Sequence, residues 1–169
     1  MDAAEAAAIE HACLPTIGAC GGQFTANTMA MVGEAIGLSP PNTSMVPGVY
    51  SIRAAIAQQA AKRLVAMLQA GGPLPRDIVT RKALENGAAI VAATGGSTNA
   101  ALHLPALANE AGIAFTMEDC AAVFARTPLI GDLRPGGRFT AKDVHEAGGT
   151  AVIIGALIRS GHMHGACLT

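Results

Sequence analysis

An apolar side chain recurs every four positions through residues 52–70, and this repeat predicts a long amphipathic helix. The repeat consists of Ile52, Ile56, Ala60, Leu64 and Leu68. Such spacing places side chains on one face of a helix. The run Gly71-Gly72-Pro73 follows directly and is expected to end the helix. Lys62 and Arg63 lie mostly off the repeat, so we expect them on a solvated face rather than against an anionic substrate.

Capping residues and apolar periodicity predict helices along most of the remaining chain. The expected helices cover residues 3–12, 24–36, 81–93, 117–125, 141–146 and 150–159. Threonines 80, 116 and 140 precede three of them and are expected to be N-caps. In the last helix, the expected buried face consists of Val152, Ile153, Ala156 and Leu157.

Prolines and glycines mark the connections between these helices. Residues 38–48 contain Pro40, Pro41 and Pro47, which predicts a loop. Pro105 removes one helical hydrogen bond, so a kink or a late start is expected in the apolar segment that contains it. Short strands are expected near residues 128–133 and 165–169.

Composition limits which residue types can form the core and which partners the protein can bind. The chain has 169 residues, 51% of them hydrophobic and only 3% aromatic, so one domain with a core of Ala, Val, Ile, Leu and Met is expected. A formal net charge of −1 gives no electrostatic footprint for nucleic acid. Apolar runs are too short to span a membrane, and the acidic N-terminus predicts no signal peptide.

The four cysteines, at positions 13, 20, 120 and 167, form no CxxC pair. We therefore expect a reduced cytoplasmic protein in which Cys13, Cys120 and Cys167 are small buried apolar residues. His162 and His164 diverge at i, i+2 and are not expected to form a metal pair. His103, among apolar neighbours, is expected to be a structural residue.

Cys20 has a different setting, because it stands among glycines in the stretch of residues 18–29, Gly-Ala-Cys-Gly-Gly-Gln-Phe-Thr-Ala-Asn-Thr-Met. Glycines allow close approach of a bulky group. A helix begins directly after them, and the N–H groups of a helix N-terminus favour a thiolate. Cys20 is therefore a candidate metal ligand or a candidate nucleophile.

A second glycine-rich segment, Thr94-Gly95-Gly96-Ser97-Thr98-Asn99, also precedes an apolar run. Its hydroxyl and amide side chains are typical of a helix start. The same N–H groups could hold a carboxylate or a phosphate at the next helix. No lysine follows the glycines at the required position, so the segment is not a P-loop.

Four motifs together resemble one enzyme family. The stretch around Cys20 resembles the third cluster-cysteine motif of the dihydroxy-acid and sugar-acid dehydratases, iron–sulfur lyases that include 6-phosphogluconate dehydratase. Further matching motifs lie at residues 93–104, 126–138 and 164–169. Their order and spacing fit the family along the whole chain. One departure is Ala166, where the family pattern has an acidic residue.

The resemblance implies a partial N-terminal domain over residues 1–169. Its fold class is α/β, and this chain would be the mainly helical portion, with most of a small parallel sheet missing. Two upstream cluster cysteines, a magnesium site and a C-terminal domain with a catalytic serine would also lie outside it. Cys20 would be one ligand of a [2Fe–2S] cluster in an enzyme that also uses Mg²⁺, and the chain by itself is expected to be inactive.

Three functions follow from these observations. The favoured one is part of a dihydroxy-acid dehydratase, a cytoplasmic homodimer of branched-chain amino-acid synthesis that acts on a small dihydroxy acid. The second is part of a sugar-acid dehydratase, and the loop from Ser39 to Val49 is where the two would differ. The third is a non-catalytic helical binding or assembly module. No nucleic-acid or membrane partner is expected for any of them.

Overall fold

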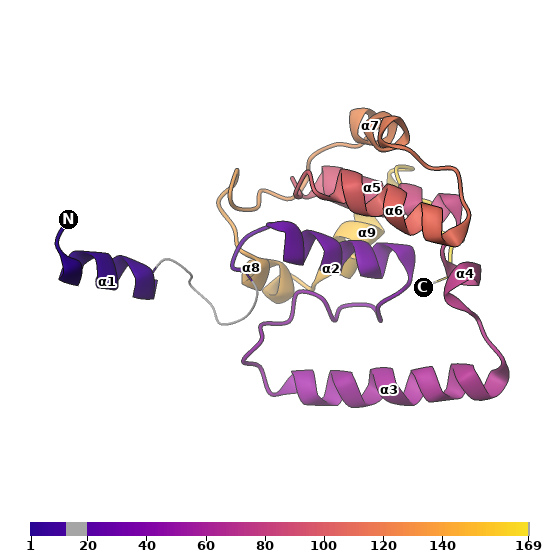
Figure 1. The fold of residues 1–169 in the computed structure, drawn as a ribbon, viewed down its shortest axis with the longest axis horizontal. Helices are drawn as coiled ribbons and strands as arrows, with labels where there is room; N and C mark the ends of the chain where they lie inside the picture. The colour runs from indigo at the N-terminus through magenta and orange to yellow at the C-terminus, as the bar shows by residue number, and fades with distance from the viewer. Residues whose placement is uncertain (13–19, 169) are drawn as a thin grey trace.

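The computed structural model describes residues 1–12 and 20–168, which form helices joined by turns and loops (Figure 1). The helices are α1 (Ala3–Ala12), α2 (Thr25–Ile36), α3 (Ile52–Ala70), α4 (Pro75–Ile78), α5 (Arg81–Ala93), α6 (Ala100–Ala111), α7 (Met117–Arg126), α8 (Ala141–Glu146) and α9 (Thr150–Arg159). The expectation of a mainly helical domain is confirmed. Within the described ranges, no helix is both long enough and apolar enough to cross a membrane.

The short strands expected at residues 128–133 and 165–169 do not form in the described part of the chain. The β pairing seen there is an isolated bridge between Leu133 and Phe139. Strand formation requires partners for the backbone N–H groups. The N–H groups of Ile130 and Gly131 instead donate to the carbonyl of Ala93, at 2.9 and 2.7 Å. This segment is therefore fastened to the end of α5 rather than to a sheet.

Helix α5 is the centre of the core. Nine of its residues are buried, and α2, α6, α7 and α9 all pack on it. Small residues allow these helices to approach closely. A Cβ atom at Gly87 would lie 3.0 Å from Leu104 of α6 and 3.2 Å from Ile36 of α2. Alanine and glycine thus let the helices pack closely, so the core is filled with few aromatic side chains.

The predicted N-caps are confirmed. The hydroxyl of Thr80 accepts from the N–H of Ala83 at 3.1 Å. At α7, Thr116 and Asp119 cap each other, and Asp119 accepts from the N–H of Thr116 at 2.8 Å. At α8, Asp143 accepts from the N–H and the hydroxyl of Thr140. These short-range signals fix where the helices begin.

The carboxyl groups of Asp119 and Asp143 are expected to make the stability of the fold depend on pH in the acid range. The N–H of Thr116, together with Arg81, lowers the pKa of Asp119, and the N–H of Thr140 lowers the pKa of Asp143. A lowered folded pKa contributes stability above the unfolded value of about 3.9, and this contribution is lost as the pH falls through the folded pKa. The urea midpoint should therefore fall between about pH 5 and pH 2.

Asp119→Asn tests this expectation. We expect a lower urea midpoint at pH 7 and a shallower decline on acidification than in the unmodified chain. Glu110→Gln removes a charge from the exposed surface of α6 and is the control. Equal acid slopes for Asp119→Asn and the unmodified chain would contradict the assigned role of Asp119.

The expectations for Pro105 and for the buried face of α9 are met only in part. Helix α6 starts at Ala100 and continues through Pro105, so of the kink or late start expected there, the late start does not occur. Of the expected buried face of α9, Leu157 is buried, whereas Val152 is 52% exposed, because α2 and α5 cover the helix on one side only. His103 is exposed, and its expected structural role stays a prediction.

The apolar repeat of α3 forms the predicted helix but buries none of its residues. The helix lies apart from the group formed by α2, α5 and α6 (Figure 1). Ile56 and Ala60 are half-buried beside the loop of residues 40–46. Sequence periodicity therefore predicted the helix correctly but did not predict what covers it.

Candidate functional site

Cys20 lies in the turn directly before α2, where its side chain is half-buried. The side-chain amide of Asn27 donates to the carbonyl of Cys20 at 2.9 Å and to that of Gly22 at 2.7 Å. Asn27 therefore holds the cysteine turn against the first turn of its own helix. The thiol keeps access to solvent, as an external ligand would require.

Of the other cysteines, Cys120 is fully buried, and burial raises the pKa of its thiol. Its predicted role as a core residue is confirmed. Cys167 is half-buried and packs against the core. Cys13 lies outside the described residues. Cys20 is thus the described cysteine whose surroundings differ most from those of a packing residue.

The segment of residues 94–99 packs beside the cysteine turn. The hydroxyl of Thr25, at the start of α2, lies 3.0 Å from the hydroxyl of Ser97 and accepts from the Asn99 amide at 2.9 Å. The N–H of Ser97 donates to the hydroxyl of Thr28 at 3.0 Å. Two motifs about 70 residues apart in sequence are therefore joined by hydroxyl and amide contacts.

These contacts change the interpretation of the 94–99 segment. Asn99 occupies the N-cap of α6 without a side-chain capping bond, and its amide is directed to Thr25 instead. The hydroxyl of Ser97 accepts from the N–H of Asn99 at 3.3 Å, so a turn of the serine type precedes the helix. The segment thus supports the start of α2 as well as the start of α6.

A buried glutamine links the same two motifs from inside. Gln23 is 2% exposed, and its amide nitrogen donates to the hydroxyl of Thr94 at 2.9 Å and to the sulfur of Met31 at 3.2 Å. Among the described residues, the side-chain oxygen of Gln23 has no hydrogen-bond partner. Sequence reasoning missed Gln23, and its place between a glycine and an aromatic residue gave no signal.

The third motif braces the cysteine turn from the other side. The N–H of Gln23 donates to the carbonyl of Arg134 at 2.6 Å, and the N–H of Ala141 donates to the carbonyl of Gly21 at 2.9 Å. A Cβ atom at Gly22 would lie 2.9 Å from the Arg134 carbonyl oxygen. Gly22, two positions after Cys20, is therefore required by the approach of the 131–141 segment.

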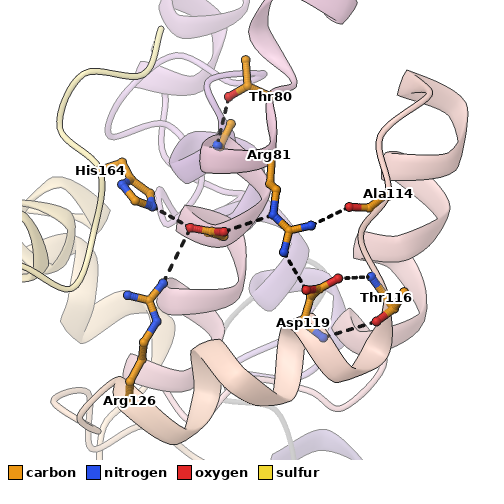
Figure 2. Close-up of polar contacts among 9 residues, drawn as sticks. Thr80, Arg81, Ala114, Thr116, Asp119, Arg126 and His164 are labelled. Atoms are coloured by element: carbon orange, nitrogen blue, oxygen red, sulfur yellow. Dashed lines mark hydrogen bonds and ion pairs between the residues drawn. The ribbon is translucent and has the colours of Figure 1, made fainter.

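The fourth motif attaches to α5 nearer its other end, through the network drawn in Figure 2. The ring of His164 lies 2.7 Å from the carboxylate of Glu85, and the backbone of His164 exchanges two hydrogen bonds with Asn86. Arg81 and Arg126 also contact Glu85, at 3.4 and 3.7 Å. Local sequence gives no sign of this carboxylate, because Glu85 lies 79 positions away from His164.

The loop that follows α2 is fixed by one buried carboxylate. Glu34 is 3% exposed and accepts from the N–H groups of Asn42, Thr43 and Ser44 at 2.8, 3.1 and 2.7 Å, and from the Ser44 hydroxyl. A groove of about 470 Å³ separates this loop from α3. The loop expected to differ between substrate types is therefore held in one shape rather than being loosely attached.

Metal-binding capacity can be judged from the donor atoms present. Among residues 1–12 and 20–168, no group of three or more His, Cys, Asp or Glu side chains could hold a metal ion. The chemistry and accessibility of Cys20 suit one thiolate ligand of a soft metal centre.

Comparison with known proteins identifies the family of this chain. Residues 1–169 match the family model for the dihydroxy-acid/6-phosphogluconate dehydratase N-terminal domain. The chain therefore belongs to the dihydroxy-acid/6-phosphogluconate dehydratase family, as the resemblance implied.

Individual relatives are similar over the whole chain. Dihydroxy-acid dehydratase 3 of Bradyrhizobium diazoefficiens is 71% identical over 169 residues, which are 100% of this chain and 29% of that protein. Dihydroxy-acid dehydratase 2 of Bordetella bronchiseptica is 63% identical over the same length and 30% of its own. The dihydroxy-acid dehydratase of Thermus thermophilus is 47% identical over 93% of this chain and 28% of its own length. The chain thus spans about 30% of the length of the curated relatives it matches.

Proposed function

We propose that this chain is the third-cysteine portion of the N-terminal domain of a dihydroxy-acid dehydratase, and that Cys20 is one ligand of its [2Fe–2S] cluster. The observation that carries the proposal is the cysteine turn, which three of the four family motifs meet to hold. Identities of 71% and 63% to proteins named dihydroxy-acid dehydratase favour this activity over a sugar-acid dehydratase. The reaction would convert a 2,3-dihydroxy acid into a 2-keto acid in branched-chain amino-acid synthesis.

The bound cluster would supply an iron atom with an open position, which acts as a Lewis acid toward a leaving hydroxyl. The residues of this chain would position the Cys20 ligand. Asn27 fixes the backbone of Cys20, Gln23 anchors the turn to Thr94, and Ser97 and Asn99 fix the start of α2. Each contact limits the positions that the Cys20 sulfur can adopt.

The proposal also requires cluster ligands and catalytic groups from outside this chain. One thiolate does not hold a [2Fe–2S] cluster, which takes ligands on both irons. The other thiolates, the Mg²⁺ ligands and the proton-transferring serine would come from polypeptide beyond this chain. The 169 residues by themselves should therefore be inactive, while the complete enzyme would be a cytoplasmic homodimer.

A chimeric enzyme tests the proposal. In the Bradyrhizobium relative, the matched 169 residues are replaced by this chain, and the protein is reconstituted anaerobically with iron and sulfide. We expect the chimera to retain stoichiometric iron and sulfide and to dehydrate 2,3-dihydroxy acids faster than aldonic acids. Cys20→Ser should remove more than about 90% of the cluster, since a serine hydroxyl is a poor ligand for this soft centre.

The control for loss of a thiol is Cys167→Ser, which changes a half-buried cysteine away from the turn. It should leave iron and sulfide content unchanged. Full cluster content in Cys20→Ser would overturn the assignment of Cys20. A preference of the chimera for aldonic acids would support the sugar-acid dehydratase instead. A cluster held by the 169 residues without added polypeptide would show that this chain supplies further ligands.

A further inference from the structure

One face of α3 is apolar along the length of the helix and faces solvent. With a rotation of about 100° per residue, six apolar side chains fall within a sector of about 100°. They are Ala54, Ala57, Ala61, Leu64, Val65 and Leu68, and we call them the outer face of α3. All six are exposed, and Leu64, Val65 and Leu68 are 56%, 52% and 70% exposed.

This pattern is typical of a helix that packs against another element. No polar residue falls within the sector, and three alanines on the same side allow a second backbone to approach closely. A solvated helix would place charges there. Ile56 and Ala60 lie beyond the Leu64 edge of the sector, on the side of α3 toward the 40–46 loop. The outer face is therefore a second packing surface with nothing on it among the described residues.

The charges around this face restrict what can cover it. Helix α3 has no acidic residue, and Arg53 and Lys62 flank the outer face, whereas Arg63 lines the groove toward the 40–46 loop. Two copies of α3 facing each other across a twofold axis would bring like charges together at close range. A partner that is apolar at its centre and acidic at its edge fits both properties of the helix. The charge pattern thus disfavours a second α3 and favours a different segment.

The relatives indicate where such a segment comes from. The match to the Bradyrhizobium relative includes all of α3, yet the matched residues are only 29% of that protein. In that relative, more than two thirds of the polypeptide lies outside the match and is available to cover the corresponding helix face. An intramolecular contact also avoids the loss of translational freedom that association of separate chains requires.

We propose that the outer face of α3 docks, within one polypeptide, against an apolar segment with acidic edges from the part of the dehydratase outside these 169 residues. The inference rests on the proposed function, because it takes the dehydratase as the complete protein. In this proposal, α3 forms the contact between this helical portion and the remainder of the enzyme. Exposure of Leu64 and Leu68 is then a property of the separated portion.

The experiment compares two double variants in two settings. Leu64→Lys with Leu68→Lys places charges on the outer face. Ala66→Lys with Gln69→Lys adds the same charge on the neighbouring exposed side of the helix. Each pair is made in the 169-residue chain and in the chimera described above, and thermal midpoints and gel-filtration volumes are measured.

In the 169-residue chain, both pairs should leave the thermal midpoint within about 2 °C, because all four positions are exposed there. In the chimera, the leucine pair should lower the midpoint by at least about 5 °C, since buried lysines would lack partners. The alanine–glutamine pair should have little effect there. Equal midpoints for both pairs in the chimera would overturn the proposal.

Two other results would also decide the question. If the 169-residue chain is a dimer that the leucine pair converts to a monomer, a second copy covers the face and the proposal is wrong. If the leucine pair lowers the midpoint in the isolated chain equally, the face packs within this portion, and the proposal is again wrong. Cluster content and activity of the unmodified chimera test the proposed function separately, because neither depends on the lysine variants.

Discussion

Glu34→Ala is expected to lower the free energy of unfolding by about 3 kcal/mol, because it leaves three part-buried backbone N–H groups and one hydroxyl without their acceptor. The lost carboxylate accepts from the N–H groups of Asn42, Thr43 and Ser44. Each buried donor left unsatisfied costs about 1–3 kcal/mol, and the loop can recover part of this by opening to water. Chemical denaturation at pH 7 measures the difference.

Glu34→Gln separates charge from hydrogen bonding. The glutamine oxygen can still accept from part of the loop, so we expect a loss smaller than that of the alanine variant. Glu110→Ala, on the exposed side of α6, is the matched control and should change the free energy by less than about 0.5 kcal/mol. If Glu34→Ala were no more destabilising than this control, the loop would not depend on the carboxylate.

The effect should extend beyond the loop. The side-chain oxygen of Asn42 accepts from the N–H of Ala151 at 3.0 Å, and the hydroxyls of Ser44 and Thr150 lie 2.9 Å apart. Both contacts hold the first turn of α9. Glu34 therefore connects α2, the 39–49 loop and α9, although these segments lie more than 100 positions apart at the extremes.

What the sequence predicted correctly was encoded over a few neighbouring residues. Thr80 and Thr116 cap helices because a hydroxyl and the next N–H groups lie within one turn, and at α8 the carboxylate of Asp143 lies within one turn of the N–H of Thr140. The cysteine turn was identifiable for the same reason, since glycines surround Cys20. Its family resemblance then indicated a metal ligand, and that role stays a prediction.

The parts that could not be predicted depend on contacts between distant residues. Nothing around Glu34 distinguishes it from an exposed helical glutamate, yet it is buried by a loop that turns back over it. The pairing of Gln23 with Thr94 joins positions 71 residues apart. The repeat in α3 gave the correct helix and the wrong burial, because periodicity specifies a face but not the element that covers it.

Gly137→Ala is expected to have the second large effect on stability, about 3 kcal/mol. A Cβ atom at this position would lie 2.3 Å from the carbonyl carbon of Asp132 and 2.5 Å from its oxygen. The same carbonyl accepts from the N–H groups of Arg138 and Phe139, at 3.0 and 2.9 Å. The turn is closed around this backbone atom, so the added methyl group cannot be accommodated by a side-chain rotation.

Gly136→Ala is the matched control, because a Cβ atom on the neighbouring glycine would have no heavy atom within 4 Å. We expect it to change the free energy of unfolding by less than about 1 kcal/mol. Denaturant unfolding of both variants gives the comparison. Equal stabilities would show that the turn can open without loss and that its tight closure is not required.

The same pair of variants tests whether this turn supports the cysteine site. The N–H of Gln23 donates to the carbonyl of Arg134, which lies inside the turn. If Gly137→Ala displaces that carbonyl, hydrogen exchange at the Gln23 amide should become faster, whereas Gly136→Ala should leave it protected. Unchanged protection in a destabilised Gly137→Ala would mean that the turn stabilises the fold without positioning Cys20, and the bracing role of the 131–141 segment would be wrong.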